Sequence, residues 1–376
     1  MELEFSEDQE ELRDGVRSML AGECPITFVR SVVESGASVE PLWRQMVELG
    51  WPALTVPEEH GGIGLGAVEL AIVAEELGRV VAPGPFLPTT TQFLPAIREL
   101  GTAEQQARYY PAVAEGTVTG SLALHDPGRG IGLSGLTTTA TETATGIRLD
   151  GVKEFVLEGG AVTDLVVVAR LAGSDADDAV AACVVPAADA RIEAITPLDP
   201  SRGLARIILD GVEVPADRVL GTPGTITTLG VERVIQEAVT ATATEGVGVC
   251  QSIFDMTLDY AKQREQFGVP IGSFQAIKHK FADLIVALEK ARASAVFAAL
   301  AIAEDDDRRA LASSAAKVAA GECERMMSKE GIQLHGGIGW TWEHDMHLYV
   351  RRAKSTTALF GTPAEHRERI ARLLGL

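Results

Sequence analysis

A cation, an aromatic ring and a glycine lie close together in the stretch YAKQREQFGVPIGSFQAIKHKFADL. Arg264 is followed by Phe267 and Gly268, and a helical spacing resumes after Gln275. A guanidinium binds anions through a planar fork of N–H donors, and an aromatic side chain stacks on flat rings. The spacing therefore indicates a site for an anion joined to a ring. The alternative is a helix that ends at Gly268, with an ion-paired Arg and a core Phe.

A second chemical stretch is IQLHGGIGWTWEHDMHLYVRRAK, which holds His335, His344 and His347. Three histidines suggest a metal, but their spacing is not the H-E-x-x-H of a zinc helix, and we expect no metal site. The glycine pairs of this stretch and of HGGIGLG follow no strand of a βαβ unit, so they do not predict a Rossmann loop. The chain also lacks the G-x-S-x-G elbow of a serine hydrolase.

Composition places the 376 residues among globular proteins, because 46% are hydrophobic and 23% are charged. The formal net charge is −20, which argues against a nucleic-acid partner, since phosphate binding needs clustered Lys and Arg. A phosphorylated cofactor needs only a local basic site, and the charge does not exclude one.

The four cysteines, Cys24, Cys183, Cys250 and Cys323, form no C-x-x-C pair. Buried reduced thiols are the plain interpretation. The acidic N-terminal stretch has neither a basic nor an apolar signal region, and no apolar run is long enough to cross a membrane. We therefore expect a cytoplasmic protein without a membrane partner.

The hydrophobic period changes twice along the chain. Residues 1–115 show helical spacing, residues 116–224 show strand alternation, and residues 225–376 return to long helical patterns. The stretches TDLVVVARL and AVAACVVP are typical of buried strands. The pairs Asp150-Gly151 and Asp210-Gly211 predict hairpin turns. The order is therefore a helical domain, a compact and mainly antiparallel β domain, and a helical domain.

Three segments together resemble signatures of the acyl-CoA dehydrogenase family. They are LGWPALTVPEEHGGIGLG, REQFGVPIGSFQ and IQLHGGIGWTWEHDMHLYVRRAK, in the order and at the spacing of that family. The resemblance extends along nearly the whole chain. It implies an α+β fold with an N-terminal helical domain, a middle antiparallel β domain and a C-terminal four-helix bundle, in agreement with the three regions above.

The resemblance implies FAD as the cofactor and α,β-desaturation of an acyl-CoA thioester as the reaction, with an electron-transfer flavoprotein as the electron acceptor. In the family a carboxylate removes the α-proton while flavin N5 takes the β-hydride. Arg264 matches the Arg that contacts the FAD pyrophosphate of a neighbouring subunit, and Phe267 matches a ring-contacting position. The other implied cofactor contacts are Gln333, Gly336, Gly337, Phe155 and Thr362.

The chain departs from the family at the catalytic base. The usual Glu directly precedes Gly361-Thr362, and here that residue is Phe360, which cannot accept a proton. Some members place the base on the long helix, at a position that corresponds to Ala238. Neighbouring Glu237 is expected to be a solvated surface carboxylate. Glu245 lies in an apolar, small-residue stretch, where it either pairs with an Arg or faces a cleft as a candidate base.

The middle region departs as well. His125, Ile131 and Gly132 replace the Thr, Ser and Asp of a flavin-contacting loop, and Leu157 replaces a hydroxyl residue beside the flavin. The leading prediction is a flavoprotein subunit of this family that acts on an acyl-CoA thioester. The pattern of losses fits the alternative of a non-catalytic scaffold subunit, which completes the FAD site of a different acyl-CoA dehydrogenase chain and has no chemistry of its own. Within the enzyme class, the alternative is a self-sufficient homo-oligomer with Glu245 as the base.

Overall fold

The computed structural model describes residues 5–130, 132–133, 135–174 and 179–376. By contact density the chain forms two units, and neither is continuous in sequence. The first unit contains residues 1–37, 67–83 and 239–376, and the second contains residues 38–66 and 84–238. No helix of the described residues is both long and apolar enough to span a membrane.

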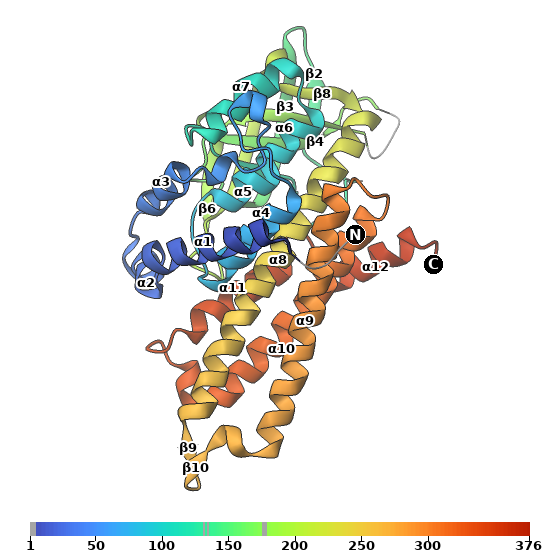
Figure 1. Ribbon diagram of the computed structural model, residues 1–376. Coiled ribbons are helices and arrows are strands. Elements are labelled where there is room, and N and C mark those ends of the chain that lie inside the picture. Colours follow the sequence, from blue (N-terminus) through green and yellow to red (C-terminus); the bar gives the residue numbers. More distant parts are fainter. Residues whose placement is uncertain (1–4, 131, 134, 175–178) are drawn as a thin grey trace. The chain divides into compact units, whose positions relative to one another are not determined.

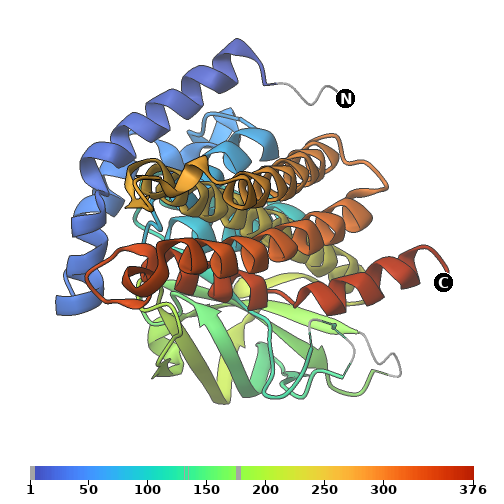
Figure 2. The ribbon, with the colours of Figure 1, turned by 90° about the horizontal axis from the view of Figure 1, so that it is seen from below.

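The first unit is helical. Its short helices are α1 (Glu7–Glu23), α2 (Ile26–Ser35) and α4 (Ala67–Arg79), and its long ones are α9 (Gln275–Ala303), α10 (Arg309–His335) and the larger part of α8 (Thr225–Gln263). The chain closes with α11 (Met346–Ala358) and α12 (Pro363–Leu373). Helix α10 packs against α9, α11 and α12, and Figure 2 shows the long α9 and α10 side by side.

Alanines make the long helices fit closely. The contact between α8, α9 and α10 contains a buried cluster of small side chains, namely Ala243, Ala298, Ala301, Ala312, Ala316 and Ala320. Small side chains let helix axes approach and interdigitate with few voids. The predicted four-helix bundle is confirmed in this unit, and the predicted tail helix is α12.

The second unit is built on one sheet with helices α3 (Glu40–Glu48), α5 (Phe86–Pro88), α6 (Leu94–Leu100) and α7 (Ala103–Ala114). The strand order is β6-β7-β3-β2-β4-β5-β8, and β1 also pairs with β4. The strands are β1 (Gly120–Ala123), β2 (Thr139–Glu142), β3 (Gly146–Leu157), β4 (Asp164–Leu171), β5 (Val180–Pro186), β6 (Arg191–Ile195), β7 (Leu204–Pro215) and β8 (Val219–Gly224).

The sheet is mixed, although most of its pairs are antiparallel as expected. Strand β4 runs parallel to both β1 and β2, and antiparallel to β5. The two apolar runs predicted as buried strands are β4 and β5, and that prediction is confirmed. The parallel pairs join strands that are far apart in sequence, so local alternation could not reveal them.

The two hairpin predictions are wrong. Asp150-Gly151 and Asp210-Gly211 lie inside the long strands β3 and β7, which pair with each other and shift register between Leu149 and Gly151. The carboxylate of Asp150 accepts a 2.9 Å hydrogen bond from the backbone N–H of Gly211. An Asp-Gly pair suits a β-bulge as well as a hairpin turn, and here the two pairs face each other across the bulge.

Candidate functional site

The end of α8 carries the first chemical stretch. The helix ends at Gln263, and a two-residue turn joins β9 (Glu265–Gln266) to β10 (Val269–Pro270), as Figure 1 shows at the end of the bundle. Phe267 and Gly268 have φ angles of 55° and 79°, the pattern of a type I′ turn. The prediction that the helix continues to Gly268 is therefore wrong, since the chain has already turned into a hairpin.

The side chains of this hairpin point to solvent. Phe267 is 93% exposed, and its ring forms a T-shaped contact with Phe274, with ring centroids 6.2 Å apart. Arg264 is exposed as well, and its backbone forms hydrogen bonds with Tyr260 and Ile271. Its guanidinium has no ion-pair partner among the described residues. A planar cationic fork with free donors is suited to a diphosphate.

The end of α10 lies beside the end of α8. The ring of Tyr260, one turn before Arg264, stacks on the ring of His335 with centroids 4.6 Å apart. Gln333 is exposed, and α10 stops at His335 because Gly336 adopts φ 63° and ψ −139°, a conformation open essentially to glycine. A Cβ atom at Gly336 or Gly337 would meet no atom within 4 Å. The backbone here is therefore open to a ligand.

We call residues 264–270 and 333–340 the bundle tip. The bundle tip contains five of the predicted contacts, from two stretches far apart in sequence. Arg264 and Phe267 come from one stretch, and Gln333, Gly336 and Gly337 come from the other. The apolar exposure is high, because Trp340 is 78% exposed in addition to Phe267. Large aromatic side chains exposed beside a cation are more typical of a binding surface than of a helix end that only faces water.

The three histidines form ring contacts. His335 lies against His344 with centroids 4.7 Å apart, and His347 stacks on Trp342 with centroids 4.3 Å apart. Burial lowers the pKa of His335 and of His347. Among the described residues, no three His, Cys, Asp or Glu side chains gather in a way that would hold a metal ion.

The position expected for the catalytic Glu lies in a fixed turn. Phe360 is buried with φ 54°, and its carbonyl accepts a 2.9 Å hydrogen bond from Nε2 of His366. Burial lowers the pKa of His366 to about 4, so the ring is neutral at pH 7. Thr362 caps α12, since its hydroxyl accepts from the backbone N–H of Glu365. The Thr362 hydroxyl therefore already has a structural partner.

A buried carboxylate stabilises the residues before that turn. Glu324 of α10 accepts hydrogen bonds from the hydroxyls of Thr356 and Thr357, and Lys317 donates to the carbonyl of Thr356. Burial raises the pKa of Glu324 to about 7, although Lys317 opposes the shift. We call residues 356–362 the sealed turn, because its polar groups are bonded within the chain. Sequence reasoning missed Glu324 and Lys317, because α10 carries other charged residues, such as the exposed Lys329, and no local signal separates the buried ones from these.

Glu245, the candidate relocated base, pairs with an Arg. Arg352 donates to its carboxylate at 2.8 Å, and the two side chains are 1% and 2% exposed. The same guanidinium donates to the carbonyls of Val81 and Ala82 at 3.1 Å. Of the two alternatives expected for Glu245, the structure has the ion pair. A carboxylate held in this way must break a buried pair before it can accept a proton.

The expectation for Glu237 is wrong. Its side chain is 7% exposed and forms an ion pair with Arg98, within the second unit. The partner lies 139 residues away in sequence, so the helix pattern alone suggested a solvated face. No carboxylate is available at Ala238 itself, which is buried.

The sheet positions the residues predicted to contact the flavin. Phe155 is 51% exposed with φ 57°, whereas Leu157 is buried. Nearby, Lys153 donates to Asp126 at 2.6 Å, and neither side chain is exposed. Burial lowers the pKa of Lys153 to about 8. Burial alone would raise the pKa of Asp126, but Lys153 and the Thr138 hydrogen bonds keep it below its usual value.

The Asp126–Lys153 pair holds the loop that contains His125 and Gly132, because Asp126 also accepts from the backbone N–H of Thr138 at 2.9 Å. Sequence analysis missed this pair, and the signal for it was a Lys in the middle of an alternating strand. Ile131, the third departure in this loop, lies outside the described residues.

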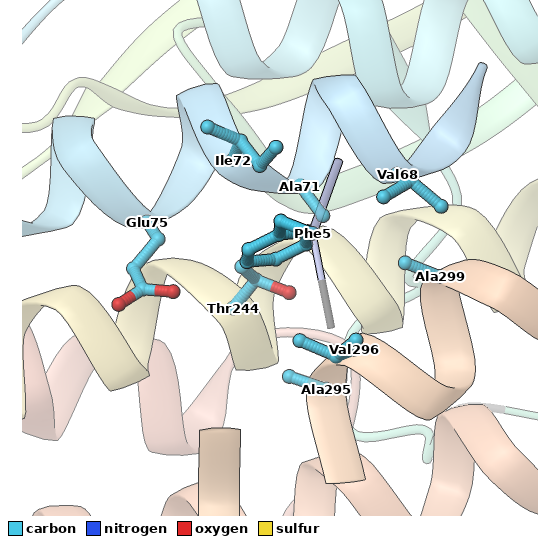
Figure 3. A pocket seen from close by; sticks show the side chains of 9 residues that line it. All are labelled: Phe5, Val68, Ala71, Ile72, Glu75, Thr244, Ala295, Val296 and Ala299. Carbon is cyan, nitrogen blue, oxygen red and sulfur yellow. The ribbon is translucent and has the colours of Figure 1, made fainter. Parts of the chain in front are cut away.

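A small cavity in the first unit is lined by Phe5 and by side chains of α4, α8 and α9, as Figure 3 shows. Most of these side chains are apolar, and Glu75 and Thr244 are polar. The volume of the cavity is about 10 Å³, which is room for a single water molecule. It is too small for an acyl group.

Comparison with known proteins identifies the class. Residues 6–117 match the family model of the acyl-CoA dehydrogenase N-terminal domain, and residues 219–375 match that of the C-terminal domain. The chain belongs to the acyl-CoA dehydrogenase family. It is 33% identical over 361 residues to acyl-CoA dehydrogenase IpdE2 of Mycobacterium tuberculosis, covering 96% of this chain and 95% of that protein.

Two solved structures are similar along the whole chain. One is a variant of the steroid ACAD Tcur3481-Tcur3483, with 31% identity, a TM-score of 0.87 and 98% of each chain covered. The other is the ChsE4-ChsE5 complex from Mycobacterium tuberculosis, with 26% identity, a TM-score of 0.89, and 100% of this chain and 99% of that chain covered. These likenesses confirm the family and the fold predicted from the three sequence segments.

FAD is the cofactor of this family. The bundle tip fits part of such a group, because it offers the free Arg264 fork and the open backbone of Gly336 and Gly337. The flavin-side positions fit less well. Leu157 has no hydroxyl to donate, and the sealed turn presents Phe360 where a carboxylate is expected.

Proposed function

We propose that this chain is a subunit of a mixed acyl-CoA dehydrogenase assembly, in which it completes the FAD site of a different chain that carries the catalytic base. The assembly would remove hydrogen from the α and β carbons of an acyl-CoA thioester. The observation that carries the proposal is the sealed turn: Phe360 stands at the position of the base, and the alternative Glu245 is held by Arg352.

The chemistry requires a base, and the candidate carboxylates that the structure describes are already engaged. Desaturation takes a proton from the α carbon and a hydride from the β carbon, and an enzyme places a carboxylate at the first of these. FAD, when bound, supplies the acceptor for the hydride. Glu237, Glu245 and Glu324 are each bonded inside the fold. The partner chain would therefore provide the proton acceptor.

The contribution of this chain would be cofactor binding from the bundle tip. Arg264 would pair with the diphosphate, and backbone N–H groups near Gly336 and Gly337 would lie against the cofactor, because no side chain blocks them. Phe267 would contact a flat ring. Its left-handed backbone is unfavourable for a bulky residue, and strain of this kind is typical of functional positions.

The similar proteins support a mixed assembly. The ChsE4-ChsE5 structure is of a complex of two named components, and the Tcur3481-Tcur3483 structure is of a steroid ACAD. By this likeness, an acyl group with a steroid ring system is the first substrate class to test. An electron-transfer flavoprotein would reoxidise the assembly.

The first experiment measures FAD for each chain, by visible absorbance, in the protein purified alone and with a co-expressed partner chain. We expect little FAD in the chain alone, and one FAD for each pair of different chains in the mixed assembly. A homo-oligomer that holds a full complement of FAD, and whose flavin bleaches on addition of an acyl-CoA, would overturn the proposal.

A pair of variants separates this proposal from the homo-oligomer with a relocated base. Glu245→Gln should leave turnover of the folded mixed assembly unchanged, whereas Arg264→Leu should lower its FAD content. Arg308→Leu, which removes an exposed cation of the first unit, is the matched control for Arg264→Leu. Loss of turnover in Glu245→Gln with normal FAD content would instead assign the base to Glu245.

A further inference from the structure

The loop between α10 and α11, residues 336–345, is held at its far end by α2. Arg30 donates to the carboxylate of Asp345 at 2.6 Å and to the backbone carbonyls of Trp342 and Glu343 at 2.9 and 3.3 Å. One guanidinium therefore binds both a side-chain carboxylate and two backbone carbonyls of the loop. More than 300 residues separate the two partners in sequence, and both belong to the first unit.

Glu34 completes this contact. Its carboxylate accepts from Arg30 at 2.9 Å and from the indole N–H of Trp342 at 3.0 Å. The Trp342 ring, which is 46% exposed, has two further contacts, because His347 stacks on it and the Arg351 guanidinium lies 5.0 Å from its centroid. Charge-assisted hydrogen bonds of this geometry fix orientation as well as distance. We call Arg30 and Glu34 the loop clamp.

The clamp acts on the segment that bears the open glycines. Gly336 and Gly337 begin the loop in a short 3-10 helix, Gly336–Trp340, and the clamp binds Trp342, Glu343 and Asp345 near its end. The loop is therefore held at both ends, by α10 at the first and by α2 at the second. Between them Trp340 remains 78% exposed. Residues 341–345, which follow the 3-10 helix, are in neither helix nor strand. Without such an anchor they would sample many conformations, and ordering them on ligand binding would cost affinity.

We infer that Arg30 and Glu34 are positioning residues, which preorganise the loop so that Gly336 and Gly337 meet the cofactor of the neighbouring chain. The pair touches no cofactor itself and acts through the loop. The cofactor part of this inference rests on the proposed function, whereas the ordering of the loop by the clamp does not.

The test compares Arg30→Leu with the control Arg13→Leu. Arg13 is a matched residue, because its side chain is 17% exposed against 19% for Arg30 and it forms an (i,i+3) ion pair on α1. Amide hydrogen exchange of residues 336–345 is measured in the purified chain. FAD dissociation is measured in the mixed assembly.

We expect loop exchange to accelerate about tenfold or more in Arg30→Leu, since hydrogen bonds to charged groups are worth enough for such a factor. FAD should dissociate about tenfold faster, with the turnover number at saturating FAD retained. Arg30→Lys keeps the positive charge but not the planar guanidinium. Its rates of loop exchange and FAD dissociation should lie between those of the wild type and Arg30→Leu. Glu34→Gln gives a milder test if Arg30→Leu does not fold.

Equal loop exchange in Arg30→Leu and Arg13→Leu would overturn the clamp itself. Faster loop exchange with unchanged FAD dissociation would overturn its role in cofactor capture. Failure of the proposed function would give a different result, because FAD binding by wild-type mixed assemblies would then not depend on this chain. The exchange measurement would still decide whether the clamp orders the loop.

Discussion

The bundle tip and the sealed turn belong to the same helical unit and treat their polar groups in opposite ways. At the tip, Arg264 and the backbone of Gly336 and Gly337 are left open, and Phe267 is held in solvent on a strained backbone. In the sealed turn, the hydroxyls of Thr356 and Thr357 donate to Glu324, and the carbonyls of Thr356 and Phe360 accept from Lys317 and His366.

The difference supports the proposed function. An exposed cation beside exposed aromatic rings gives the isolated chain no stability, so its presence is explained by a ligand or partner. Buried carboxylates bonded to the chain contribute to its structure and are not free for chemistry. A chain that keeps the first kind of region and seals the second is suited to hold a cofactor whose reaction takes place on another chain.

The largest expected effect on stability comes from the buried ion pair of Glu245 with Arg352. Arg352→Leu leaves a buried carboxylate without its cation and two carbonyls without a donor. We expect the free energy of unfolding to fall by about 3–5 kcal/mol, as measured by urea denaturation. The double variant Glu245→Leu/Arg352→Leu should lose less, because no uncompensated charge remains.

The exposed pair of Arg308 with Asp306 provides the control for this prediction. Arg308→Leu should leave the urea midpoint nearly unchanged, since surface ion pairs contribute little. If Arg352→Leu were as stable as Arg308→Leu, the buried charge of Glu245 would not need Arg352. That result would favour Glu245 as a relocated base.

The second prediction concerns pH and the carboxylate that supports the sealed turn. The pKa of Glu324 is about 7 in the folded chain, against an ordinary value of 4.5. The folded chain therefore binds more protons than the unfolded chain between these pH values. This contribution to stability is fully present below pH 4.5 and is lost as the pH rises through about 7.

Glu324→Gln removes this dependence. Between pH 5 and pH 7 the stability of the variant, minus that of the wild type, should rise with pH by up to about 1.4 kcal/mol per unit. His366 titrates in the opposite direction, but it is present in both proteins and cancels in the difference. Glu322→Gln, an ion-paired carboxylate on the same helix, is the control and should give a flat difference over this range. Parallel curves for Glu324→Gln and the wild type would contradict the assignment.

Sequence patterns predicted the elements of both regions but not the partners of their charges. The helical spacing of α10 and the apolar runs of β4 and β5 are local, so they could be read from neighbouring residues. The ion pairs of Glu237 with Arg98 and of Glu245 with Arg352 join residues more than 100 positions apart. Whether a carboxylate is solvated or paired depends on such contacts, and for that reason the expectation for Glu237 was wrong.

The predictions from turn residues were wrong where the same residue pair suits two different backbone structures. Asp-Gly pairs suit both a hairpin and a bulge, and in β3 and β7 the sheet pairing selects the bulge. Gly268 likewise suits either a helix end or a type I′ turn, and the structure has the turn. The grouping of Arg264 with Gln333 came from the resemblance to a family and not from either stretch alone.

The smallest expected effect tests whether Phe267 of the bundle tip lowers the stability of the chain and strengthens its binding of FAD. Phe267→Asn creates the Asn-Gly pair that a type I′ turn prefers, and it should raise the free energy of unfolding of the chain alone by up to about 1 kcal/mol. The same change removes the exposed ring, so FAD retention by the mixed assembly should fall. Phe267→Tyr keeps both ring and strain, and should alter neither quantity. A Phe267→Asn variant that is more stable and also retains FAD as the wild type does would remove the ring from the cofactor site, leaving Arg264 and the open glycines as the part of the tip that binds.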